Sequence, residues 1–320
     1  MSFTAEVKDE LSRVEGRKVC CRKSELAALV RVEGTLHLTG NDNYRLEIAT
    51  ETAPVARKTI KLLHGLYGLK TELTVRRSVL HRTNNYLITV PAQPKLKDAL
   101  AELGVLDESH GLEYGIDPRL VKRDCCAIAY LRGTFLGGGF VADPHGDFHF
   151  ELTAETPEMA DDLVALMARF EVVAKVTRRR GAYAVYLKGA EPIVTFLALA
   201  GAHRALLRTE DVRIVKGMRN DVNRLVNAET ANLQKTADAA IDQVRTIQRL
   251  EDTRGLGSLP PALRELAQLR LDNPEVSLRE LGELAVPPLT KSAVYHRVRR
   301  LEQLAVRLGA DAGARRSSGK

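Results

Sequence analysis

A basic segment near the C-terminus carries side chains suited to contacting nucleic acid. Thr290 can cap a helix that begins at Lys291, whose apolar positions, Val294, Val298 and Leu301, recur at four- and three-residue steps. The opposite side presents hydroxyl, imidazole and cationic donors: Thr290, Lys291, Ser292, Tyr295, His296, Arg297, Arg299 and Arg300. Such a side is either a solvated basic surface or one that contacts DNA, and the preceding residues help to distinguish the two.

Two further helices and a rigid turn are predicted just before this segment. The first helix covers Pro261 to Leu271, and Asn273-Pro274 ends it. Ser277 to Glu280 is a capping box that opens a short helix, Leu278 to Ala285, in which Leu278, Leu281 and Leu284 are expected to be buried. Val286 to Leu289 contains two prolines and cannot continue it. This order predicts a helix-turn-helix over Ser277 to Leu304 and favours contact with DNA.

The position of each side chain along a recognition helix predicts its role. Residues early in such a helix reach base edges in the major groove, so Lys291, Ser292, Tyr295 and His296 are candidates for base readout. Arg299 and Arg300 are expected to hold phosphates, and recognition of guanine by Arg297 or Arg299 is a further alternative.

The polar segment from Arg208 to Arg254 is helix-prone and contains an unusual number of asparagines. Asn is a poor helix former, which leaves two interpretations open. Asn220, Asn223, Arg224 and Asn227 could contact phosphates or bases, or the asparagines could cap short helices and make polar contacts in a linker. We favour caps and contacts. Gly255 to Pro261 then marks a break before the next helix.

The charge distribution agrees with a nucleic-acid contact at the C-terminal end. The net charge is +7 over 320 residues, and residues 206–320 contribute five of these charges, with 20 Lys/Arg against 15 Asp/Glu. No run of about 18 apolar residues and no signal-peptide pattern occurs, so we expect a cytoplasmic protein without a membrane contact.

The first 205 residues contain an internal repeat. Cys20-Cys21 recurs as Cys125-Cys126, and the segment from Tyr44 to Thr52 recurs from Phe148 to Thr156, at offsets of 105 and 104. Each unit, about 20–104 and 125–200, has the pattern of an apolar helix, a hairpin, a helix, a second hairpin and a closing helix. In the first unit the first hairpin turns at Gly40 to Asn43, the middle helix lies near Ala53 to Tyr67, and the second hairpin begins with a strand at Glu72 to Arg77. The corresponding strand of the second unit is expected at Val172 to Thr177. The predicted fold is therefore α+β, with the order αββαββα used twice.

The two cysteine pairs fall at equivalent places in the repeats, so pseudo-symmetry could bring all four together. Their spacing is not the C-x₂-C of zinc sites, and disulfides are unlikely in a cytoplasmic protein. Buried packing of small side chains is the favoured interpretation, with a metal or redox role as the alternative. No metal and no cofactor is expected.

The opening helices resemble the LAGLIDADG motif of homing endonucleases. Leu26 to Gly34 fits its nine positions, and Leu131 to Gly139 fits more loosely. The resemblance implies that the penultimate residue of each motif is a carboxylate that holds Mg²⁺ for DNA cleavage. Glu33 retains this acid, whereas Gly138 has no side chain to bind a metal. We therefore expect no catalysis; residual cleavage through Glu33 and an acid such as Asp143 is the alternative.

As a whole the chain resembles the WhiA family of bacterial regulators. The resemblance rests on Phe3 to Leu11, Arg219 to Asn227, Glu229 to Asn232, Leu259 to Arg264 and Thr290 to Arg297. It implies binding to double-stranded promoter DNA on the nucleoid, control of cell division or sporulation genes, and partners such as a WhiB-like iron–sulfur regulator and an RNA polymerase sigma factor. A module that docks a protein and binds DNA secondarily remains an alternative.

The expected organisation has four parts. Residues 1–205 form the degenerate LAGLIDADG-like domain, and 206–258 form a helical linker segment. Residues 259–308 form an all-α helix-turn-helix domain, and 309–320 form a disordered tail.

Overall fold

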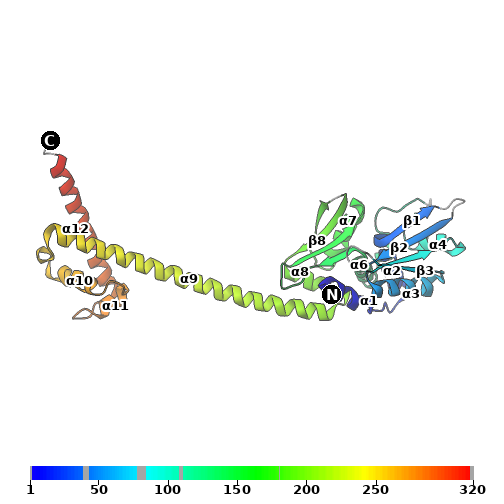
Figure 1. Ribbon diagram of the computed structural model, residues 1–320, viewed down its shortest axis with the longest axis horizontal. Helices are drawn as coiled ribbons and strands as arrows, with labels where there is room; N and C mark the ends of the chain where they lie inside the picture. Colours follow the sequence, from blue (N-terminus) through cyan, green and yellow to red (C-terminus); the bar gives the residue numbers. More distant parts are fainter. Residues whose placement is uncertain (1, 39–42, 78–83, 108–110, 180, 318–320) are drawn as a thin grey trace. The chain divides into compact units, whose positions relative to one another are not determined.

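The computed structural model describes residues 2–38, 43–77, 84–107, 111–179 and 181–317, with side chains described as far as Leu308 (Figure 1). The chain divides into two compact units, Met1–Gly217 and Met218–Lys320. Within the described residues, no helix is both long and apolar enough to cross a membrane.

The first repeat contains the predicted order of elements. Helix α2 (Val19–Glu33) leads into β1 (Gly34–Leu38) and β2 (Tyr44–Thr50), and α3 (Ala53–Tyr67) follows. Strands β3 (Glu72–Arg77) and β4 (Asn84–Val90) come next, and α4 (Pro94–Glu102) closes the unit. The sheet is antiparallel with order β1-β2-β4-β3. The turn predicted at Gly40 to Asn43 lies outside the described residues except for Asn43.

The second repeat has the same topology. Helix α6 (Asp124–Gly138) precedes β5 (Gly139–Val141), β6 (His149–Ala154) and α7 (Pro157–Ala168); then come β7 (Lys175–Arg179), β8 (Ala182–Lys188) and α8 (Ala190–Ala200). The strand order β5-β6-β8-β7 corresponds strand for strand to that of the first sheet. The twofold use of αββαββα is therefore confirmed.

Two helices were not expected from the sequence. Helix α1 (Phe3–Ser12) is capped by Ser2, whose Oγ accepts a 3.3 Å hydrogen bond from the Ala5 amide. Its buried residues Phe3, Val7 and Leu11 pack into the core of the two repeats. The one-turn helix α5 (Pro118–Val121) precedes α6. Strand β7 begins at Lys175 rather than at Val172, which is buried in the preceding loop.

Helices α2 and α6 pack against each other inside the first unit. A Cβ atom at Gly133 would lie only 2.4 Å from the Glu25 carbonyl oxygen and 2.8 Å from the Ala28 Cβ. The two backbones thus approach more closely than any side chain at this position would allow.

The segment expected to be a linker with short helices is instead one continuous helix, α9 (His203–Arg254), which passes the boundary between the two units. The interpretation of the asparagines as helix caps is therefore wrong, because they lie inside the helix. Ala240, Ile247 and Leu250 are buried near its C-terminal end.

The second unit continues with η1 (Leu256–Ser258), α10 (Pro261–Asp272), α11 (Leu278–Glu283) and α12 (Lys291–Ser317). Two buried clusters form its core. One contains Leu266, Leu281, Val294 and Val298, and the other contains Ile247, Leu250, Leu259, Leu263, Ala267 and Leu301. Leu284 was expected to be buried but is 48% exposed; it follows the last residue of α11, and Ala285 is buried in its place. Helix α12 extends into the segment 309–320 for which we predicted a disordered tail, and residues 318–320 lie outside the described part.

Candidate functional site

Local hydrogen bonds fix the start of α11 and the turn between α11 and α12. The Ser277 Oγ accepts from the Glu280 amide at 3.3 Å, and the Ser277 amide donates to a Glu280 carboxylate oxygen at 2.8 Å, so the predicted capping box is present. The Thr290 Oγ1 accepts from the Ala293 amide at 3.3 Å and caps α12 as expected. The Leu289 amide also donates to the Gly282 carbonyl at 2.8 Å, which holds the turn against α11.

Helix α12 presents one apolar and one polar side, as the sequence predicted. Val294, Val298 and Leu301 are buried. The exposed residues are Thr290, Lys291, Ser292, Tyr295, His296, Arg299 and Arg300. Arg297 is only half-exposed, and its Nη1 donates to the Ala262 carbonyl of α10 at 3.4 Å. The donors therefore form one accessible surface on the first three turns of the helix, with Arg297 at its margin.

The candidate residues on α9 lie on a different element. Asn220, Asn223, Arg224 and Asn227 are all exposed, and Arg224 is paired with Asp221 one turn away. Ala240 is the first buried residue of this helix in the second unit. Asn227 lies 13 residues before it, which is about 20 Å along the helix axis. The structure thus brings the α12 donors together and places the α9 residues outside that cluster.

The two LAGLIDADG positions lie at equivalent helix ends. Glu33 is the last residue of α2 and Gly138 the last residue of α6, and both helices are followed by a glycine in extended conformation. A Cβ atom at Gly138 would lie 2.7 Å from the Val32 Cγ1 and 3.2 Å from the Thr153 Cβ. The second position therefore lacks a carboxylate, and any side chain there would have to displace Val32.

The environment of Glu33 disfavours its charged form. Burial raises the pKa of the Glu33 carboxyl to about 7, although the nearby Lys8 and a hydrogen bond with Thr50 act in the opposite direction. The Lys8 Nζ donates to the Gly137 carbonyl at 2.8 Å, and burial lowers the pKa of this ammonium group. Asp143, the suggested second acid, pairs instead with His145 and Arg208. A cation thus stands beside the remaining acid of the motif.

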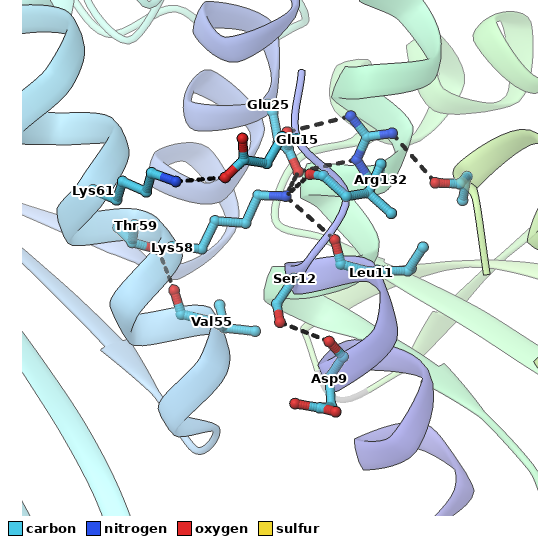
Figure 2. Close-up of polar contacts among 12 residues, drawn as sticks. Asp9, Leu11, Ser12, Glu15, Glu25, Val55, Lys58, Thr59, Lys61 and Arg132 are labelled. Carbon is cyan, nitrogen blue, oxygen red and sulfur yellow. Dashed lines mark hydrogen bonds and ion pairs between the residues drawn. The ribbon is translucent and has the colours of Figure 1, made fainter. Parts of the chain in front are cut away.

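A buried ion cluster, absent from our expectations, joins the elements around α2 and α6 (Figure 2). Glu25 is fully buried and contacts the Arg132 guanidinium at 3.0 Å and the Lys58 Nζ at 2.6 Å. Lys58 also donates to the carbonyls of Leu11 and Val14, and Arg132 donates to that of Ala200. Burial lowers the pKa of the Lys58 ammonium group, and Glu25 opposes this effect. The sequence feature that could have indicated this cluster is Arg132, a single cationic residue within an apolar helix.

The cysteine pairs also meet, as the pseudo-symmetry suggested. The sulfur atoms of Cys20, Cys21, Cys125 and Cys126 all lie within 4.8 Å of one another at the N-terminal ends of α2 and α6. In the described part of the chain this is the one group of three or more Cys, His, Asp or Glu ligands arranged closely enough to hold a metal ion.

Fold and site together define a class: a two-repeat LAGLIDADG-like domain with an incomplete acid pair, followed by a helix-turn-helix domain. Residues 19–106 match the WhiA N-terminal LAGLIDADG-like domain, 127–219 the WhiA LAGLIDADG-like domain, and 222–305 the WhiA C-terminal HTH domain. The chain belongs to the WhiA family.

Relatives and one solved structure match nearly the whole length of the chain. The "probable cell division protein WhiA" of Desulforamulus reducens is 50% identical over 310 residues, or 96% of each chain, and that of Desulfitobacterium hafniense (strain DSM 10664 / DCB-2) is 50% identical over 309, also 96% of each. A crystal structure of full-length WhiA from Thermatoga maritima aligns with a TM-score of 0.59 and 26% identity, covering 96% of this chain and 99% of that one.

Proposed function

We propose that the protein is a sequence-specific double-stranded DNA-binding regulator that acts at promoters through α12. The observation that carries the proposal is the cluster of exposed donors on the first three turns of α12, held in place by a buried apolar stripe and a capped turn. Lys291, Ser292, Tyr295 and His296 read base edges, and Arg299 and Arg300 hold phosphates. Thr290 fixes the start of the helix, and Arg297 acts at the margin of this surface.

The exposed residues of α9 supply additional contacts in this proposal. Asn220, Asn223, Arg224 and Asn227 occupy two turns of a solvent-exposed helix, and amide and guanidinium groups donate readily to phosphate oxygens. Since they lie about 20 Å or more along α9 from its buried end, they would contact a segment of DNA other than the one that α12 reads.

The names of the relatives support a proposal for the biological role. Because they are named probable cell division proteins, we propose that this protein controls cell division genes, and sporulation genes in an organism that forms spores. The protein then acts in the cytoplasm, on the nucleoid. The first unit docks a protein partner, with a WhiB-like iron–sulfur regulator and an RNA polymerase sigma factor as the candidates.

Point variants of the full-length chain test the assignment of roles. Ser292→Ala and His296→Ala are expected to reduce the preference for specific over random DNA by about 1–3 kcal/mol, because each removes a base contact. Arg299→Ala is expected to weaken binding to both and to lower the slope of log affinity against log salt by about one, because it removes a phosphate contact. Footprinting and gel-shift titrations at several salt concentrations measure both effects.

The matched control is Arg213→Ala, which removes the same charge from the first unit, where Arg213 pairs with Glu210. It should leave affinity and salt slope nearly unchanged. Specific binding that survives loss of Ser292, His296 and Arg299 together would contradict the proposed role of α12.

A further inference from the structure

The four cysteine sulfurs have the spacing of a mononuclear metal site. They are the only cysteines of the chain, and all four sulfur atoms lie within 4.8 Å of one another, with 4.0 Å between those of Cys125 and Cys126. Four thiolates bound tetrahedrally to one zinc ion at about 2.3 Å have their sulfurs about 3.8 Å apart. Small side-chain rotations would therefore close the cluster around an ion.

Packing alone does not account for this arrangement. Cys21 and Cys126 are buried against Ala129 and could serve as small apolar side chains. Cys125, however, is exposed, and Cys20 packs against this group but is only half-buried, so packing accounts for Cys20 in part and does not account for Cys125. Both nevertheless direct their sulfur atoms into the same cluster, which is buried on one side and accessible to an ion on the other. This distribution is the reason to prefer a binding site over the packing interpretation.

The electrostatic surroundings suit an anionic metal–thiolate group. Each pair lies in the first turn of a helix, α2 or α6, and neither Lys18 nor Arg123, the residues that precede these helices, makes a side-chain capping hydrogen bond. The sulfurs thus lie at the N-terminal ends of both helices, where the helix dipole is positive and favours thiolates. The Arg123 Nη1 also lies 3.9 Å from the Cys20 Sγ. Four thiolates around a divalent cation carry a net charge of about −2, which these groups offset.

We propose that Cys20, Cys21, Cys125 and Cys126 bind one Zn²⁺ ion that cross-links the two repeats at the N-terminal ends of α2 and α6. On binding, four thiols release their protons to solvent as four Zn–S bonds form, without a change of oxidation state. An all-sulfur tetrahedral site favours zinc or a single iron. A [4Fe–4S] cluster is disfavoured because its four cysteines bind four separate irons and hold their sulfurs farther apart.

The primary test is the metal content of the full-length protein. Elemental analysis by mass spectrometry is expected to find about one zinc per chain. Replacement of the bound ion by Co²⁺ should give the intense visible absorption bands of a tetrahedral thiolate site. The Cys125→Ser variant should lose most of the zinc; because Cys125 is exposed, this change leaves the core intact. The control Val19→Ser alters an exposed residue next to the first pair and should retain the ion.

Several results would overturn the proposal. The first is a metal-free wild-type protein that gains neither bound zinc nor a higher unfolding temperature when Zn²⁺ is added. The second is an intact mass that shows disulfides in the freshly prepared protein. The third is bound iron in place of zinc. The wild-type measurements decide the question even if a cysteine variant fails to fold, because zinc content and the Co²⁺ spectrum do not depend on a variant.

Discussion

Glu33 is the one carboxylate at the two equivalent LAGLIDADG positions, because the second position is Gly138. Burial raises the pKa of its carboxyl to about 7, against an ordinary value of 4.5. In the folded protein it therefore holds its proton between these two pH values, where the unfolded chain releases it. The unfolding free energy must consequently fall as pH rises through this window.

The variant Glu33→Gln tests this consequence. Because an amide has no charge to bury, the variant is expected to match the wild type at about pH 5 and to be more stable at about pH 8, by up to about 3 kcal/mol. Urea denaturation of the two proteins at both pH values measures the difference. Equal stabilities at both pH values would show that the carboxylate is solvated and the pKa unshifted.

Glu25 balances two buried cations, so its loss should be costly. Glu25→Ala leaves Arg132 and Lys58 without their anion, and we expect a loss of about 3–5 kcal/mol in the unfolding free energy of the first unit. The control is Glu15→Ala, because Glu15 pairs with Lys61 on the surface, where solvent screens the charges and the pair contributes little to stability. Denaturation followed by circular dichroism checks both, and similar losses for the two variants would argue against the cluster.

At the scale of elements, the close packing of α2 against α6 is expected to contribute strongly to the stability of the first unit. Gly133→Ala would place a Cβ atom 2.4 Å from the Glu25 carbonyl oxygen, so the two helices must separate. We expect a destabilisation of about 1–3 kcal/mol, measured by the thermal unfolding midpoint.

Gly65→Ala in α3 is the matched control for this substitution. No atom lies within 4 Å of the Cβ position there, and alanine favours a helix over glycine by about 1 kcal/mol, so this variant should be slightly more stable than the wild type. A neutral Gly133→Ala would mean that the helices pack less closely than the structure shows.

The elements also show where local sequence patterns suffice. Helix α3 and strand β3 have the predicted bounds, because a proline near the first turn and regular apolar spacing act within a few residues. The capping box at Ser277 was likewise predicted from the sequence. The continuous helix α9 was not predicted, since asparagines lower helix propensity by amounts that a long helix tolerates. Arg270 was also missed: its guanidinium is buried and donates to the carbonyls of Asn273 and Val276.

At the scale of the whole molecule, the proposal predicts binding without cleavage. The full-length protein, incubated with Mg²⁺ or Mn²⁺ and a plasmid that carries its binding site, should leave the DNA intact, because only one of the two motif acids is present. Gly138→Asp should not restore cleavage, since the new side chain would meet Val32 and Thr153. Metal-dependent cleavage that disappears in Glu33→Ala would contradict this prediction.

The sequence by itself determined the duplicated αββαββα order, the helix-turn-helix and its polar side, and the loss of the second motif acid. These features depend on residue type, periodicity and caps, which act over a few neighbouring positions. Only the tertiary structure decided that Glu25 pairs with both Arg132 and Lys58, that Gly138 lies against the Val32 side chain, and that two cysteine pairs from separate repeats lie together. Burial and contacts between residues far apart in the sequence determine these properties, so no local sequence pattern predicts them.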